Sequence, residues 1–166
     1  MTQVFLSLGS NIDREHNLAS GLTSLARQFG AMQLSPVYES VAVGFVGEPF
    51  LNMVVQLQTG LPVGQLVDRL HRIEAGHGRV RGEKKCASRT LDIDVLTYGD
   101  VTGVVDGVTL PRDEIYRYAF VLKPLCDLAG NQMVPGKALS FDQLLQGLDF
   151  EAQQLWQVPF DWQPPS

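Results

Sequence analysis

Residues 79–99 read Arg-Val-Arg-Gly-Glu-Lys-Lys-Cys-Ala-Ser-Arg-Thr-Leu-Asp-Ile-Asp-Val-Leu-Thr-Tyr-Gly, and the character of this stretch changes halfway along. Its first half is basic and poor in apolar residues. Its second half alternates apolar and acidic residues over 91–95, which predicts a half-buried β-strand. In such a strand Asp92 and Asp94 project from the same face, with Cα atoms about 6.5–7 Å apart.

Two adjacent carboxylates repel each other, so Asp92 and Asp94 call for cations nearby. Five basic residues lie just upstream: Arg79, Arg81, Lys84, Lys85 and Arg89. Carboxylates beside a cluster of cations are the groups that bind a polyphosphate through Mg²⁺. The competing interpretation is ordinary, because acidic residues on an exposed sheet face and a solvated basic loop are both common. The proximity of the two features favours the metal site.

The bulk composition describes an acidic globular protein. The chain has 166 residues, 45% of them hydrophobic, and a net charge of −5, which argues against a general nucleic-acid or membrane binder. No apolar run approaches the roughly 20 residues that cross a bilayer, and the N-terminus lacks the features of a signal peptide. The two cysteines form no metal motif. We therefore expect one domain over 1–166, monomeric and cytoplasmic.

The order of expected elements predicts the fold class. Strands are expected at 3–8, 32–43 and 50–58 and at the Asp-Ile-Asp stretch, with helices after Asn11 or Asp13 and from Pro62 to about Glu74. This order predicts an α+β protein with a ferredoxin-like βαββαβ core, mainly antiparallel, with helices packed on the sheet. The expected additions are a weak strand at 103–109, a short helix at 113–119, a segment at 119–129 with a strand-like start and a helical end, a helix at 141–148 capped by Ser140, and an irregular tail.

Two common phosphate-binding motifs are absent from the sequence. Five residues instead of four separate Gly130 from Gly136 and Lys137, so this is not a P-loop, and no Gly-x-Gly-x-x-Gly occurs. A bound nucleotide would therefore be held by metals and arginines, whose planar guanidinium groups grip phosphate oxygens.

A series of short motifs resembles one known family. In chain order they are Gly9-Ser10-Asn11, Ser35-Pro36-Val37-Tyr38-Glu39-Ser40, Phe50-Leu51-Asn52, Arg72-Ile73-Glu74, Gly78-Arg79-Val80-Arg81, Arg89-Thr90-Leu91-Asp92-Ile93-Asp94, Leu110-Pro111 and Phe120-Val121-Leu122-x-Pro124-Leu125. Over about residues 3–130 the chain resembles 6-hydroxymethyl-7,8-dihydropterin pyrophosphokinase of the folate pathway. The string that begins at Arg89, with the upstream Arg-x-Arg, is the specific part of the likeness.

The resemblance implies transfer of pyrophosphate from ATP to the hydroxymethyl group of 6-hydroxymethyl-7,8-dihydropterin, leaving AMP, with two Mg²⁺ ions held by Asp92 and Asp94. It implies catalytic roles for Arg79, Arg89, Asp92 and Asp94. It implies a nucleotide site made of Glu74, Arg79, Arg81, Lys85, Arg89 and Arg112. It implies a pterin site made of Ser40, Val43, Phe50, Asn52 and Phe120, the last being the stacking partner. Segments 44–49 and 82–88 match mobile loops of the family.

Several nucleotide-side positions depart from the family pattern together: Lys85, Cys86, Arg112, Asp113 and Tyr118. Where the family usually has a tryptophan in this loop, the chain has Cys86. Where the family has a histidine after Leu-Pro and an arginine before the stacking phenylalanine, the chain has Arg112 and Tyr118. Two alternatives therefore stay open. The chain could bind a pterin without efficient pyrophosphoryl transfer, or it could transfer to a different pterin or to a nucleoside.

Overall fold

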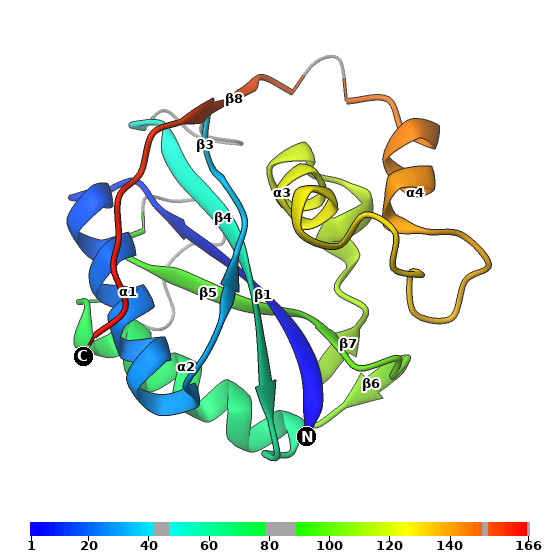
Figure 1. Ribbon diagram of the computed structural model, residues 1–166, viewed down its shortest axis with the longest axis horizontal. Coiled ribbons are helices and arrows are strands. Elements are labelled where there is room, and N and C mark those ends of the chain that lie inside the picture. Colours follow the sequence, from blue (N-terminus) through cyan, green and yellow to red (C-terminus); the bar gives the residue numbers. More distant parts are fainter. Residues whose placement is uncertain (42–46, 79–88, 151–152, 166) are drawn as a thin grey trace.

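The structure is a computed structural model that describes residues 1–41, 47–78, 89–150 and 153–165. Its strands are β1 (Thr2–Ser10), β2 (Gln33–Leu34), β3 (Val37–Ser40), β4 (Phe50–Thr59), β5 (Asp92–Tyr98), β6 (Gly103–Val105), β7 (Val108–Leu110) and β8 (Leu155–Val158). Its helices are α1 (Arg14–Phe29), α2 (Val63–Gly76), the 3₁₀ helix η1 (Asp113–Tyr116), α3 (Ala119–Ala129) and α4 (Phe141–Gly147). Figure 1 shows their arrangement.

The main sheet has the strand order β5-β1-β4-β3-β8, with β2 beside β4, and its neighbours pair antiparallel. With β2 and β3 taken as the second core strand, this is the ferredoxin-like order in which each βαβ unit leaves a gap that an antiparallel strand fills. The α+β prediction is therefore confirmed. The strand order also places β1, which carries Gly9, between β5 and β4.

The two faces of the sheet bury two separate apolar cores. One core contains the buried leucines of α1 and α2, together with Leu91, Ile93 and Val95. The other contains Val54 and the buried residues of α3 and α4. Figure 1 shows the two helix pairs on opposite sides of the sheet. We call these sides the α1/α2 face and the α3/α4 face.

The alternation of β5 assigns its acidic residues to one of these faces. Successive side chains of a strand point to opposite sides. Because Ile93 and Val95 are buried on the α1/α2 face, Asp92 and Asp94 lie on the α3/α4 face. The predicted half-buried strand is thus confirmed. The polar side of β5 does not face open solvent as in a two-layer antiparallel sheet, because η1 and α3 lie over this side of the sheet.

Some element boundaries differ from those expected. The strand at 32–43 is interrupted at Ser35 and Pro36, where the Ser35 hydroxyl accepts a hydrogen bond from the Val54 amide at 2.9 Å. The first strand does not break at Gly9 but continues to Ser10, paired on both sides. The 103–109 strand is the β6–β7 hairpin, turned at Asp106 and Gly107 with φ of 51° and 80°.

The C-terminal third differs more. Residues 119–129 are helical throughout, so the strand-like start was wrong: the apolar residues follow helical spacing against one core. Ser140 caps α4 through a capping box with Gln143, as predicted. The tail is not wholly irregular, because β8 adds to the edge of β3. Within the described ranges, no helix is long and apolar enough to span a bilayer.

Candidate active site

One row of residues crosses the sheet on the α3/α4 face, near the end of β1 and the starts of β4 and β5. In register, Asp92 of β5 lies opposite Gly9 of β1, Gly9 opposite Asn52 of β4, and Asn52 opposite Tyr38 of β3. Two strand spacings, about 9–10 Å in all, therefore separate Asp92 from Asn52. Residues that are far apart in the sequence meet here because strand pairing sets their register.

Gly9 forms the floor between the two ends of this row. A methyl group at Gly9 would lie 3.2 Å from Asn52 Oδ1 and 3.6 Å from a ring carbon of Phe50. Asn52 and Phe50 therefore lean over the glycine and occupy the space that a side chain there would need. This is a position where glycine matters for close approach and not for backbone strain.

The end of the row at β4 is buried, neutral and hydrogen-bonded. Asn52 Nδ2 donates to the hydroxyl of Ser40 at 2.6 Å, and both residues are buried. Ser40 lies opposite Phe50 in the β3–β4 register. The bond orients the Asn52 carboxamide, with its Oδ1 on the side of Gly9. These are three of the residues that the resemblance assigns to pterin.

Helix α3 brings Phe120 to the same face. Phe120 lies in the first turn of α3, half-buried at the edge of the α3/α4 core, and α3 packs on β3 and β4. The Tyr118 ring stacks on it, with centroids 4.9 Å apart and planes at 19°. Tyr38 helps to hold α3, because its hydroxyl donates a hydrogen bond to Asp127, which also pairs with Lys123. Burial first, and then the Asp127 carboxylate, raise the pKa of Tyr38.

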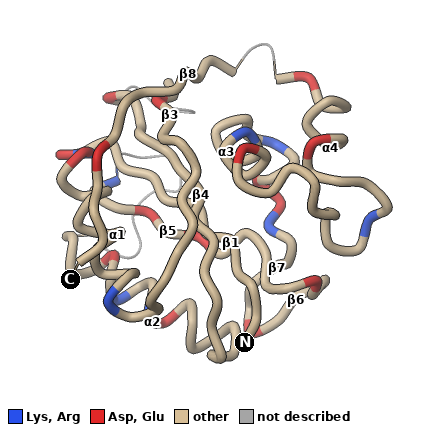
Figure 2. Tube along the Cα trace, in the orientation of Figure 1, with Lys and Arg blue, Asp and Glu red and all other residues tan. Residues whose placement is uncertain are grey.

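The end of the row at β5 is strongly acidic. Burial raises the pKa of Asp94 well above its ordinary value, and the negative charge of Asp92 adds to the rise. Arg112 opposes it, with Nη2 3.1 Å from Asp94 Oδ1 and Nε 3.3 Å from Glu114 Oε2. Acidic positions along β5 and around it are visible in Figure 2.

Glu74 supports β5 from the end of α2. Its carboxylate is buried and accepts a hydrogen bond from the amide of Ile93 at 2.8 Å. Ile93 stands between the two aspartates, so Glu74 fixes the backbone that carries both. By their spacing, Glu74 and His77 could be metal ligands or, more commonly, hydrogen-bonded surface residues, and the resemblance assigns Glu74 to the nucleotide. Glu74 is buried, so for it the surface interpretation was wrong. His77 bonds the Ile73 carbonyl at 2.7 Å and the Ser20 hydroxyl at 2.8 Å.

Asn11, immediately after β1, connects two distant parts of the chain. Its Oδ1 accepts the Arg89 amide at 2.7 Å, its amide donates to the Arg89 carbonyl at 3.0 Å, and its Nδ2 donates to the Glu48 carbonyl at 3.0 Å. Glu48 and Arg89 follow closely on segments 42–46 and 79–88, which lie outside the described residues. Asn11 thus holds the two places where the described chain resumes.

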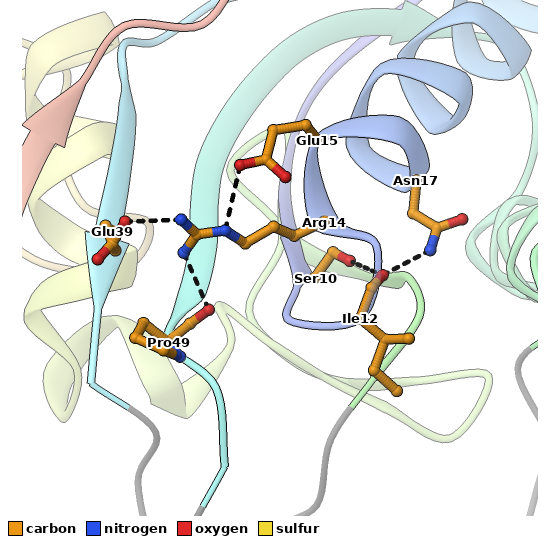
Figure 3. Close-up of polar contacts among 7 residues, drawn as sticks. All are labelled: Ser10, Ile12, Arg14, Glu15, Asn17, Glu39 and Pro49. Atoms are coloured by element: carbon orange, nitrogen blue, oxygen red, sulfur yellow. Dashed lines mark hydrogen bonds and ion pairs between the residues drawn. The ribbon is translucent and has the colours of Figure 1, made fainter.

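Arg14 makes a parallel connection from the first turn of α1. Its guanidinium bonds the carboxylate of Glu39 at 2.8 Å and the carbonyl of Pro49 at 3.1 Å, and its Nε lies 3.3 Å from Glu15 (Figure 3). No sequence pattern indicated a role for Arg14, and Asn11 was placed at the expected start of a helix and in the Gly-Ser-Asn motif. The Gly-Ser-Asn motif was the available signal, but no local pattern indicates which carbonyls and amides it meets.

The described residues bring together most of the predicted site. Those found on or beside the α3/α4 face of the sheet are Ser40, Phe50, Asn52, Asp92, Asp94, Arg112 and Phe120. Glu74 reaches β5 from α2, and Arg89 is buried beside Asn11. Val43, Arg79, Arg81 and Lys85 lie outside the described residues.

Comparison with known proteins assigns the family. The family model described as 7,8-dihydro-6-hydroxymethylpterin-pyrophosphokinase (HPPK) matches residues 5–130. The chain belongs to this family. A 2-amino-4-hydroxy-6-hydroxymethyldihydropteridine pyrophosphokinase of Pseudomonas aeruginosa is 34% identical over 154 residues, covering 90% of this chain and 93% of the relative. One from Haemophilus influenzae is 28% identical over 160 residues, covering 93% and 99%.

Solved structures support the HPPK fold. A Plasmodium falciparum HPPK-DHPS with SDX-DHP superposes with a TM-score of 0.67 at 15% identity, over 88% of this chain and 43% of that chain. The triple mutant of that protein with pteroate gives a TM-score of 0.68 at 13% identity. This chain therefore spans less than half of those longer proteins, and the likeness concerns fold alone.

Proposed function

We propose that this protein transfers pyrophosphate from ATP to the hydroxymethyl group of 6-hydroxymethyl-7,8-dihydropterin in folate biosynthesis, releasing AMP. The observation that carries the proposal is the row Asp92–Gly9–Asn52, which sets an acidic group and a carboxamide on either side of a glycine. A pterin bound at Asn52 would present its hydroxymethyl group toward the aspartates. The family match and the two full-length relatives support the same reaction.

The pterin would be read at the buried, neutral end of the row. The Asn52 carboxamide, held by Ser40, offers a donor and an acceptor of fixed orientation to the ring edge. Phe50 and Phe120 supply the aromatic surfaces, Phe120 by stacking. The Ser40–Val43 backbone is assigned to the pterin by resemblance.

The aspartates suit Mg²⁺ in their donor chemistry. Carboxylate oxygens are hard ligands, and Mg²⁺ is commonly held by one or two carboxylates together with substrate phosphates. Among the described residues no group of three or more potential ligands occurs, so Asp92 and Asp94 would rely on the phosphates of ATP to complete the coordination. When bound, two Mg²⁺ ions would neutralise charge on the α–β bridging oxygen as AMP leaves.

The basic residues would hold the triphosphate. Attack at the β-phosphorus requires the pterin hydroxyl to be placed in line, and guanidinium groups fix phosphates in such geometry. We assign this role to Arg79, Arg81, Lys85, Arg89 and Arg112. Glu74 would contribute by holding the backbone of β5 through the Ile93 amide. Support comes from Arg89, whose backbone Asn11 holds on both sides.

A second function is favoured by two contacts on the nucleotide side. Arg112 is engaged with Asp94, and Tyr118, which replaces an expected arginine, stacks on Phe120. A protein altered in this way could bind the pterin without efficient transfer, or act on a different pterin. Calorimetry separates these possibilities: pterin binding without measurable Mg-ATP binding favours the binding protein.

A coupled assay of AMP formation from ATP, Mg²⁺ and the dihydropterin tests the main proposal. Turnover well above that of an Asp92→Asn variant is expected. Equal rates for the two proteins would refute it. Light scattering on the same preparation tests the further expectation of a monomer, and fractionation of cells tests the cytoplasmic location.

A further inference from the structure

Arg112 is placed by its backbone as well as by its side chain. Its amide donates to the carbonyl of Leu96 at 2.8 Å, which fixes its main chain beside β5 two residues beyond Asp94. Its guanidinium then spans two carboxylates, Asp94 of β5 at 3.1 Å and Glu114 of η1 at 3.3 Å. Less than a third of each of the three side chains is exposed, so solvent screens these contacts only in part.

Arg112 is the positive charge among several negative charges around Asp94. Asp92, Glu114 and Glu74 all add negative charge to the surroundings of Asp94, whereas Arg112 supplies positive charge. In the free protein, Arg112 therefore offsets the mutual repulsion of these carboxylates. The η1 position of Glu114 also gives the guanidinium a second partner, which it can keep when it leaves Asp94.

A metal ion and the Arg112 guanidinium compete for the Asp94 carboxylate, because the guanidinium already lies 3.1 Å from its Oδ1. Mg²⁺ binds an oxygen at about 2.0–2.1 Å, and a guanidinium nitrogen on the same oxygen would lie within a few ångströms of the divalent charge. The repulsion is strong at such separations in a partly buried site. A metal ion on Oδ1 therefore requires the guanidinium to move off that oxygen, and a metal ion on Oδ2 is disfavoured while the guanidinium stays.

We propose that Arg112 is the resident counter-ion of Asp94 and exchanges with the metal when the nucleotide binds. The inference rests on the proposed function, because it takes Asp94 as a metal ligand. The displaced guanidinium, still tethered through Glu114 and the Leu96 carbonyl, is then free to pair with the polyphosphate that arrives with the metal. Arg112 is thus a positioning residue that weakens binding of the metal alone and favours joint binding of metal and nucleotide.

Titration calorimetry with Mn²⁺ alone, and then with Mn²⁺ and a non-hydrolysable α,β-methylene ATP analogue, tests this exchange. Arg112→Gln should bind Mn²⁺ alone about two- to fivefold more tightly than the unmodified protein, because a competing partly exposed ion pair is gone. The same variant should bind the analogue with Mn²⁺ less tightly. A simple phosphate-gripping or structural role would leave the affinity for Mn²⁺ alone unchanged or lower it.

Two variants serve as controls. Arg112→Lys keeps a cation at this position and should restore an affinity for Mn²⁺ alone close to that of the unmodified protein. Arg117→Gln removes the same charge nearby, from an exposed pair with Asp113 at 2.8 Å, and should leave that affinity unchanged. If Arg117→Gln tightens Mn²⁺ binding as much as Arg112→Gln does, the effect comes from the loss of any nearby positive charge, and the inference is overturned.

The outcome for the proposed function is read separately, in the same experiment. If the unmodified protein binds Mn²⁺ with the nucleotide analogue, Asp92→Asn loses that binding and Arg112→Gln changes nothing, only the role of Arg112 fails. If the unmodified protein binds no Mn²⁺ under either condition, the metal site fails and this inference fails with it. Circular dichroism of each variant verifies that it is folded.

Discussion

The two ends of the row across β1 differ in charge: the end at β4 is neutral and the end at β5 is acidic. At β4, Asn52, Ser40 and Phe50 are uncharged, and the polar atoms of Asn52 and Ser40 are already paired with each other. At β5, the carboxylates of Asp92 and Asp94 repel each other, and Arg112 is the cation that offsets them among the described residues. The first end is complete before any ligand arrives. In our proposal, the second is completed by cations and phosphate oxygens that come with a substrate.

The two ends therefore suit different parts of the proposed substrates: the neutral end suits the pterin ring, and the charged end suits the polyphosphate. A neutral ring edge is read by fixed hydrogen bonds, and fixed groups discriminate because an unpaired buried partner is costly. A polyphosphate carries negative charge, and in our proposal it is neutralised by metal ions on the carboxylates and by the basic residues. The two ends of the row therefore differ in charge, and substitutions at each end test the effect of that difference.

The largest expected effect comes from removing a carboxylate at the charged end. Asp92→Asn should lower the rate of AMP formation by about a thousandfold, because a metal that stabilises several kcal/mol of transition-state charge loses a ligand. Steady-state kinetics measure this, and thermal unfolding serves as the folding control. A loss below tenfold would show that Asp92 binds no essential metal.

A smaller loss, of a different kind, is expected at the neutral end. Asn52→Ala should lower kcat/KM for the pterin by about ten- to a hundredfold, because a ring edge would lose hydrogen bonds in a buried site. The KM for ATP should stay unchanged. Ser40→Ala, which removes only the group that orients Asn52, should cost less. An equal effect on the two KM values would contradict the separation of the two ends.

Filling the floor between the ends should have a moderate effect. Gly9→Ala places a methyl group 3.2 Å from Asn52 Oδ1, tighter than ordinary contact, so Asn52 and Phe50 must shift. We expect pterin affinity to fall by roughly tenfold, by analogy with overpacking costs of about 1–3 kcal/mol. Fluorescence titration with the pterin measures it. Unchanged affinity would place the pterin away from Gly9.

The smallest expected effect is a gain in stability. Because burial and Asp92 raise the folded-state pKa of Asp94, the native protein holds this proton more tightly than the unfolded chain, and its stability falls as pH rises above the ordinary aspartate range. Asp94→Asn removes this penalty and should add roughly 1 kcal/mol to the unfolding free energy near pH 7.

The pH dependence of that gain distinguishes the cause. The gain should shrink as pH falls and vanish below about 4, where the unfolded chain also becomes protonated at this residue. Denaturant unfolding at several pH values measures it. Asp113→Asn, at an exposed carboxylate paired with Arg117, is the matched control and should give no comparable gain. Destabilisation by Asp94→Asn at neutral pH would mean that the pair with Arg112 outweighs the repulsion.

Much of the fold followed from local pattern, and each failure has an identifiable physical cause. The period of two at Asp92 and Asp94 identified β5, and the helical stripes identified α1 and α2. The segment 119–129 was misjudged because its first half is apolar at nearly every position, a pattern that suits a buried strand or a buried helix. Strand β8 was missed because its four residues gain order only by pairing with β3.

For the site, residue types were predictable and partners were not. The resemblance drew attention to Asn52, Asp92 and Phe120, and the structure places these on one face of the sheet. The positions of Arg79, Arg81, Lys85 and Val43 stay predictions, since these residues lie outside the described ranges. Arg112 was noticed as a departure from the family pattern, but nothing in the sequence indicates that it meets Asp94.

The sequence alone determined that two carboxylates share one face of a strand, because side-chain direction in a strand depends only on parity. It also determined the family, because the motifs occur in one order along the chain. Only the tertiary structure decided that Gly9 separates Asp92 from Asn52, that Asn11 joins Glu48 to Arg89, and that Arg112 neutralises Asp94. Those contacts join residues far apart in the chain, and their register is set by the packing of the whole sheet.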